Sequence, residues 1–204
     1  MHSVEELQNA ITFYKRNATK LAEKYEILDF EEVHPDLIEF LSESPGCVLD
    51  VGAGSGRDAR ALVERGYDVV AVEPAQELLE IGSKLHRTTR ISWLNDKLPL
   101  LETLERGPLF QLILCSAVWM HLSRSEQVMS MNRLCELAAP GAHICITFRT
   151  ASLAEPAPIF MTEPQVIISD AANANAKLIK KSKTPDHFQR NGVEWHSLIF
   201  EVGV

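Results

Sequence analysis

The segment CVLDVGAGSGRDARALVERGYDVVAVEP, residues 47–74, combines a glycine-rich turn with a carboxylate further along the chain. Gly52, Gly54 and Gly56 follow an apolar run directly. Glycine permits tight backbone conformations and lets a ligand approach the bare backbone. Glu73 lies about twenty residues after the first glycine, at the distance where a carboxylate accepts hydrogen bonds from a ribose diol. The segment therefore predicts a site for a nucleotide-like ligand.

The spacing of the glycines bears on which nucleotide is bound. Dinucleotide-binding proteins use G-x-G-x-x-G, whereas this turn reads G-x-G-x-G and has Arg57 where the third glycine would stand. A phosphate-binding P-loop requires Gly-Lys-Ser/Thr, and none follows here. The spacing disfavours both NAD and a P-loop nucleotide.

The elements that position this turn follow from the alternation of short apolar runs with helical stretches. Such alternation is typical of a mainly parallel sheet with helices on both faces. The expected strands are 47–51, 68–72, 91–94, 110–118, 143–148, 177–183 and 193–202. The expected helices are 4–26 as one or two helices, 34–41, 57–65, 76–86, 98–106, 124–138 and 163–173.

The last two expected strands are joined by a turn-rich segment that is too short for a crossover helix. A connection of this kind makes the two strands antiparallel. Asn191 and Gly192 form a dipeptide typical of tight turns. We therefore expect one reversed strand at the C-terminal end of the sheet.

These motifs resemble those of the class I S-adenosylmethionine-dependent methyltransferases. VLDVGAGSG resembles the first motif of that family, VVAVEP its second strand with the ribose-binding acid, and WLND its third strand. FQLILCSAVWMHL and PGAHICITFR resemble the fourth and fifth strands, and the closing pair resembles the reversed seventh strand. The resemblance runs from residue 44 to the end and implies an α/β fold, a doubly wound Rossmann-like seven-stranded sheet.

The resemblance implies roles for five residues of the first three strands. Asp50, Gly52 and Gly54 would line the methionine part of the cofactor S-adenosyl-L-methionine. Glu73 would bind the ribose hydroxyls, and Asp96 the adenine amino group. Two alternatives remain open, because Asp50 is also suited to organise the turn and helix, and Asp96 to cap the helix expected after it.

The resemblance extends to the fourth strand and to the N-terminal helices. Ser116 would approach the sulfonium region of the cofactor. FYKRNATKLAEKY resembles the helix that many small-molecule methyltransferases lay over the cofactor, with Tyr14 facing the methionine end. The alternative for Tyr14 and Tyr25 is packing on the core. We expect one domain over 1–204, with a helical lid at 1–43 and the sheet core at 44–204.

Acceptors in open α/β sheets bind beyond the carboxyl ends of the strands, here after the fourth and fifth. His121 is the candidate catalytic base, with packing or capping of the next helix as the alternative. Trp119 is a candidate for stacking on the substrate or for core packing. Arg149 is suited to pair with an anionic substrate or with an acid of the protein. The proline-rich segment 150–164 is expected to wall the acceptor site.

Charge and cysteine content restrict the partners. The 204 residues include 20 Lys and Arg against 28 Asp and Glu, a net charge of −8, which disfavours nucleic acid. The four cysteines lack metal-site spacing and are expected to be reduced core residues, so we expect no metal. Neither a signal peptide nor a membrane span is apparent, which favours a cytoplasmic protein.

The sequence thus favours an S-adenosylmethionine-dependent methyltransferase that acts on a small molecule or, as a variant of the same function, on a protein side chain. A non-catalytic S-adenosylmethionine-binding regulatory module is the alternative, because methyl transfer requires no diagnostic catalytic residue. An NAD-dependent oxidoreductase is a weaker alternative, given the glycine spacing.

Overall fold

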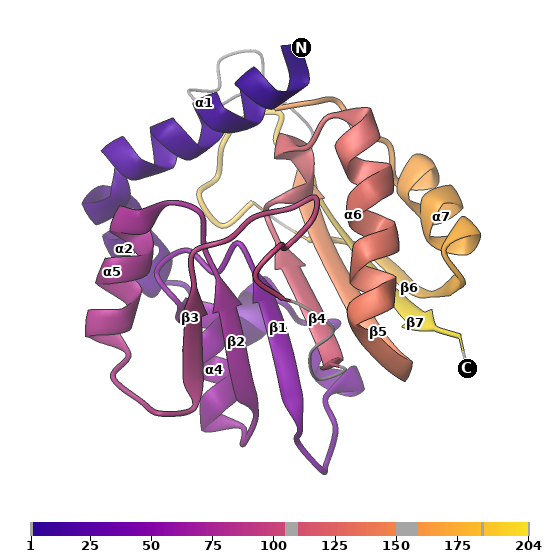
Figure 1. Ribbon diagram of the computed structural model, residues 1–204, viewed down its shortest axis with the longest axis horizontal. Helices are drawn as coiled ribbons and strands as arrows, with labels where there is room; N and C mark the ends of the chain where they lie inside the picture. Colours follow the sequence, from indigo (N-terminus) through magenta and orange to yellow (C-terminus); the bar gives the residue numbers. More distant parts are fainter. Residues whose placement is uncertain (1, 105–109, 150–158, 185, 204) are drawn as a thin grey trace.

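A computed structural model describes residues 2–104, 110–149, 159–184 and 186–203. Within these residues, one seven-stranded sheet has the order β3-β2-β1-β4-β5-β7-β6 (Figure 1). The strands are β1 Cys47–Val51, β2 Asp68–Val72, β3 Ile91–Leu94, β4 Phe110–Ser116, β5 Ala138–Arg149, β6 Ala176–Thr184 and β7 Trp195–Val202.

Strands β1 to β5 pair in parallel, and β7 is antiparallel to both of its neighbours, β5 and β6, so that β6 points in the same direction as the first five. This arrangement confirms the α/β sheet and the reversed C-terminal strand that the sequence predicts. The register aligns the carboxyl ends of the central strands, because Val51 lies opposite both Val72 and Cys115, and Ser116 lies opposite Thr147. The loops after these strands therefore meet at one edge of the sheet.

Helices cover both faces of the sheet. The α-helices are α1 His2–Arg16, α2 Ala18–Glu26, α3 Phe30–Val33, α4 Arg57–Glu64, α5 Gln76–Leu85, α6 Arg124–Leu137 and α7 Pro164–Asn173, and the 3-10 turns are η1 Ile38–Phe40 and η2 Trp119–His121. Figure 1 shows α6 and α7 in front of the sheet and α4 behind it. Helix α1 crosses the edge where the loops meet, and we call α1 and α2 together the lid.

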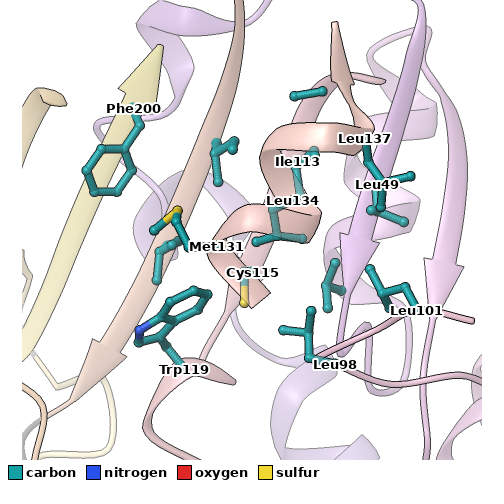
Figure 2. Close-up of a cluster of buried hydrophobic side chains, with 14 of the residues drawn as sticks. Leu49, Leu98, Leu101, Ile113, Cys115, Trp119, Met131, Leu134, Leu137 and Phe200 are labelled. Atoms are coloured by element: carbon teal, nitrogen blue, oxygen red, sulfur yellow. The ribbon is translucent and has the colours of Figure 1, made fainter. Parts of the chain in front are cut away.

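Alternating side chains of the strands supply a core on each face of the sheet. Leu49 and Ile113 belong to the cluster beneath α6, part of which Figure 2 shows, whereas Val48 and Leu112 belong to the cluster beneath α4. All four cysteines are free thiols, and Cys115 and Cys145 are buried in the core as the sequence predicts, whereas Cys47 and Cys135 are only partly buried. No helix in the described part of the chain is long and apolar enough to cross a membrane.

Two expected helices differ from the structure. Residues 98–104 form turns rather than a helix, while 105 and 106 lie outside the described residues. Asp96 accepts hydrogen bonds from the backbone nitrogen and the hydroxyl of Thr103, at 2.7 and 2.6 Å, and so closes this segment into a loop. The expected helix over 34–41 contains only the 3-10 turn η1. Residues 150–158 of the expected acceptor wall also lie outside the described residues.

Candidate active site

A cavity of about 350 Å³ lies over the carboxyl ends of the strands and beneath the lid. Its volume falls in the range of small-molecule sites. The residues that line it come from the loops after β1, β2, β3 and β4, the end of β5, the start of β7, the β6–β7 connection and the lid. Of the residues that the sequence singles out, the cavity is lined by Tyr14, Gly52, Gly54, Glu73, Asp96, Ser116, His121 and Arg149.

The glycine turn after β1 requires its glycines for backbone geometry. Gly52, Gly54 and Gly56 have φ values of +71°, +59° and +90°, a region that side chains rarely tolerate. A Cβ on Gly52 would stand 2.3 Å from the Val118 side chain, so part of the close approach there is internal packing. A Cβ on Gly54 would lie 3.7 Å from the ring of Tyr25, across the cavity side of the turn. The turn thus presents bare backbone beneath the lid.

Glu73 connects this turn with the end of β2. Its Oε2 accepts a hydrogen bond from the Gly54 nitrogen at 2.8 Å, and its Oε1 accepts one from the Ala75 nitrogen at 2.7 Å. Burial raises the pKa of Glu73 to about 7, although these two backbone donors oppose the rise. A carboxylate has about four acceptor positions. Each oxygen therefore retains capacity for a further donor from a ligand.

Asp50 lies behind the turn rather than in the cavity. It is 1% exposed and accepts a hydrogen bond from the backbone of Ala59, in the first turn of α4. Burial raises its pKa well above the ordinary value, and the neighbouring Asp58 adds to the rise. The structure thus contradicts the assignment of Asp50 to the cavity and supports the alternative, in which it organises the start of a helix whose N-cap is a glycine.

A second polar cluster anchors the start of α4. The Arg57 guanidinium donates to both oxygens of Asp58 at 2.8 Å, and His34 Nε2 lies 3.1 Å from Asp58 Oδ2. Burial alone would raise the pKa of Asp58, but Arg57 and His34 hold it well below its usual range. Arg57 and Asp58 also line the cavity. The sequence shows that Arg57 and Asp58 are neighbours. It does not show that they are buried, because their burial depends on the packing of α3 on α4.

The lid reaches the sheet core through two sets of polar contacts. Tyr14 Oη and His121 Nε2 lie 3.0 Å apart, with the rings edge to face, and Tyr14 also hydrogen-bonds with Tyr25. Burial, together with the charge of Glu73, raises the pKa of Tyr25 to about 12. Sequence patterns predict a helix here but not these partners.

The second set joins the end of α2 to the glycine turn and to the end of α5. Glu26 Oε1 accepts a hydrogen bond from Ser55 Oγ at 2.7 Å and lies 3.2 Å from His86 Nε2. Burial acts to raise the pKa of Glu26, but the hydrogen bonds from His86 and Ser55 lower it overall. These contacts hold α2 directly over the turn. The lid is therefore tied to the rest of the protein both at His121 and at the glycine turn.

Trp119 and His121 share the turn η2 but face different surroundings. His121 lines the cavity, whereas Trp119 is 0% exposed and belongs to the core cluster. Figure 2 shows the Trp119 indole among the core side chains, near Met131. The structure therefore contradicts the stacking role considered for Trp119. In a 3-10 turn, residues two apart point in different directions, and sequence alone does not indicate which one faces the ligand.

The cavity wall over β5 and β7 is aromatic and basic. The Arg149 guanidinium lies 6.0 Å from the ring of Trp195, its cross-strand partner. In the β6–β7 connection, the ring of Phe188 lies 3.8 Å from Lys24 Nζ and 5.7 Å from the Arg190 guanidinium. Arg149 is the residue of this wall that the sequence offers as a partner either of an anionic substrate or of an acid of the protein. The others become cavity residues only because the β6–β7 connection folds back beneath the lid.

Comparison with known proteins places this chain among methyltransferases. A family model for the methyltransferase domain matches residues 12–198. An uncharacterized methyltransferase of Mycobacterium tuberculosis is 40% identical over 68 residues. That match covers 32% of this chain and 28% of the relative, so it spans less than a third of either protein.

Solved structures share the fold at low identity. The 1,6-didemethyltoxoflavin N1-methyltransferase of Burkholderia thailandensis, crystallised with bound 1,6-didemethyltoxoflavin and S-adenosylhomocysteine, has a TM-score of 0.75 at 15% identity. The match covers 99% of this chain and 91% of that one. The N-methyltransferase NodS of Bradyrhizobium japonicum, in complex with S-adenosylhomocysteine, has a TM-score of 0.67 at 16% identity and covers 91% and 98%.

Proposed function

The chain belongs to the family of methyltransferase domains, and from this premise we propose that it transfers a methyl group from S-adenosylmethionine to a small molecule. The observation that carries the proposal is the single cavity in which Glu73 and the glycine turn lie at one end and His121 and Arg149 at the other. One end suits a nucleoside with an amino-acid tail, and the other suits the molecule that receives the methyl group.

The residues present fit the cofactor. Glu73 has acceptor capacity left for two ribose hydroxyls, beyond the backbone donors that it already binds. Asp96 lines the cavity beyond the neighbouring strand β3, where we place the adenine. Gly54 offers backbone to the methionine part, and Ser116 lies at the end of β4, where we place the sulfonium. When bound, the cofactor supplies an electrophilic methyl group, which an acceptor attacks with a lone pair.

The lid and the β4 loop supply what such a transfer needs from the protein. Methyl transfer depends on holding the acceptor in line with the methyl group and away from water. The Tyr14 hydroxyl is hydrogen-bonded to His121 Nε2 at the acceptor side of the cavity. We place the acceptor against this hydroxyl. As the acceptor loses its proton to the Tyr14 oxygen, Tyr14 passes its own proton to Nε2, and His121 is the final base.

The cover that the lid provides supports a small-molecule acceptor. Helices α1 and α2 cover the cavity, and Tyr14 and Glu26 connect them to the core. An extended protein substrate would have to displace these contacts, whereas a metabolite-sized molecule fits beneath them. This favours a small molecule over a protein side chain.

Calorimetry with S-adenosylhomocysteine and NAD tests the proposal. The wild-type chain should bind S-adenosylhomocysteine, and NAD should give no heat, because the glycine spacing suits a mononucleoside. Binding of NAD with no response to S-adenosylhomocysteine would reject it. Binding of S-adenosylhomocysteine without turnover of any metabolite would instead indicate a regulatory module.

A further inference from the structure

We propose that the acceptor is an uncharged small molecule and that His187, in the β6–β7 connection, recognises it through a hydrogen bond. The inference rests on the proposed function, since it concerns the half of the cavity that the cofactor leaves to the acceptor. The group that His187 binds is distinct from the atom that receives the methyl group, which we place beside Ser116 and the hydroxyl of Tyr14.

The length of the cavity leaves room for this molecule. Lining residues extend across the sheet from Glu73 after β2 to Trp195 at the start of β7. The strand order β2-β1-β4-β5-β7 separates them by four strand spacings, about 19 Å in all. A ribose held at Glu73 places the methyl donor over β1 and β4. The part of the cavity over β5 and β7 is left for a second ligand, and the β6–β7 connection contributes to its wall.

His187 brings an imidazole nitrogen without a hydrogen-bond partner to this part of the protein. The residue is half-buried and lines the cavity, and its Nε2 is shielded from solvent. Six buried side-chain nitrogen or oxygen atoms lack a hydrogen-bond partner in the described part of the chain, and His187 Nε2 is the one whose residue lines the cavity. A buried polar atom without a partner costs free energy, which a ligand that supplies the partner regains. We therefore place a polar group of the acceptor at this ring.

The backbone on both sides of His187 is fixed, whereas none of the described residues hydrogen-bonds to its ring. The Gln189 nitrogen donates to the Asp186 carbonyl at 2.9 Å, and the Arg190 nitrogen donates to Asp186 Oδ2 at 2.6 Å. Asp186 Oδ1 also accepts from the Trp195 indole at 2.9 Å, which joins the connection to β7. A half-turn of the imidazole exchanges each ring nitrogen with a carbon position, so that a nitrogen can face the ligand while the backbone stays in place.

The charged side chains around His187 already have partners within the protein, although charges of both signs line the cavity. The Arg190 guanidinium donates to Asp186 through Nη2 at 2.6 Å and through Nε at 3.1 Å. Lys24 and Arg149 lie over aromatic rings of the same wall, 3.8 and 6.0 Å from the ring centres, and neither is a free cation. An ionised acceptor would have to compete with these contacts and would lose its hydration on entry, whereas an uncharged molecule leaves the contacts intact. The wall therefore suits a neutral acceptor.

The test measures, by calorimetry, how matched probes bind to the chain saturated with S-adenosylhomocysteine. Because a neutral imidazole can accept from an O–H or donate to a carbonyl, the pairs are 2-naphthol with 2-methoxynaphthalene and 1-indanone with indane. At least one polar probe should bind about 5-fold or more tightly than its partner, since a hydrogen bond between uncharged groups has this magnitude. His187→Phe should bring that ratio to within about 2-fold of one, and His187→Gln should restore part of it. The anionic 2-naphthoate should bind more weakly than 2-naphthol.

His143→Phe is the matched control, because it makes the same change in a half-buried histidine of β5. His143 lies opposite Glu201, near the end of β7, whereas Trp195 begins β7 at the cavity. This variant should keep the wild-type ratio for both pairs of probes.

A ratio near one for both pairs in the wild type, failure of all the probes to bind, or an unchanged ratio in His187→Phe would overturn the inference. Tighter binding of 2-naphthoate than of 2-naphthol would overturn it as well, because the site would then take an anion. So would a folded His187→Phe that binds S-adenosylhomocysteine more weakly, because His187 would then belong to the cofactor half of the cavity. Failure of S-adenosylhomocysteine to bind the wild type, seen before any probe is added, would reject the proposed function instead.

Discussion

Cofactor affinity should fall as the pH falls below 7, because Glu73 must be ionised to accept hydrogen bonds from two ribose hydroxyls. In the free protein, burial raises the pKa of Glu73 to about 7. Between pH 8 and pH 5.5 the protonated fraction rises from a tenth to nearly all of the molecules. By linkage, the dissociation constant for S-adenosylhomocysteine should rise about 30-fold over this interval. Calorimetry at pH 8, 7, 6 and 5.5 measures the change directly.

The same pKa predicts how the free energy of unfolding of the free protein depends on pH. The folded pKa of Glu73 lies above its ordinary value of 4.5, so folding favours the protonated acid. The stabilising contribution of the protonated form is fully present below pH 4.5 and is lost as the pH rises through 7. At pH 8 the buried charge of Glu73 lowers the free energy of unfolding by about 3 kcal/mol. Glu73→Gln should remove this dependence, as urea unfolding at pH 5 and pH 8 would show.

Glu77→Gln provides a control for the pH measurements, because Glu77 is an exposed acid on α5 and undergoes the same chemical change. This variant should keep the wild-type pH profile of binding, whereas Glu73→Gln should bind weakly at every pH and show a flat profile. An affinity of the wild type that stays constant from pH 8 to 5.5 would refute the reasoning. So would a Glu73→Gln variant with the wild-type slope.

Three other substitutions separate site residues from structural ones. Gly54→Val should abolish S-adenosylhomocysteine binding in calorimetry. The control Gly141→Val, at a position with φ +76° and no atom within 4 Å of an added Cβ, should bind normally. Equal binding by both variants would show that the Gly54 backbone is not part of the site. His121→Ala should lower the rate of methyl transfer roughly 10²- to 10⁴-fold with nearly unchanged cofactor affinity, and Tyr14→Phe, which removes the hydroxyl that relays the proton, should lower it to a similar extent; full activity of a folded His121→Ala would exclude His121 as the base. Trp119→Ala should lower the free energy of unfolding, measured with urea, by about 3–5 kcal/mol and leave the affinity of the folded protein for S-adenosylhomocysteine unchanged. Weakened binding would show that Trp119 belongs to the site.

The strands could be predicted from sequence because each is a short apolar run between turn signals. The predicted bounds of β1, β2 and β3 agree with the structure, and the reversed β7 follows from the short connection before it. The glycine turn was equally apparent, because three positive φ angles require glycine at those positions. Glu73 could be placed in the site because its distance from the turn is set by one helix and one strand.

What sequence patterns could not provide is the direction of side chains beyond the ends of strands. Asp50 continues the strand alternation into the core, and Trp119 and His121 diverge within one turn. The wall that contains Phe188 depends on a connection whose fold is set by Asp186, which binds Arg190 and Trp195. Such contacts join residues from separate segments or irregular loops, where periodicity carries no information.

The central claim is tested most directly by following a labelled methyl group. The wild-type chain, incubated with S-adenosylmethionine labelled at the methyl carbon and with a small-molecule extract, should release S-adenosylhomocysteine and form a labelled product in equal amounts. Mass spectrometry would identify that product. The account predicts one labelled small molecule, absent with Gly54→Val and strongly reduced with His121→Ala. A folded wild-type chain that binds S-adenosylmethionine yet labels no small molecule, or that labels protein instead, would contradict it.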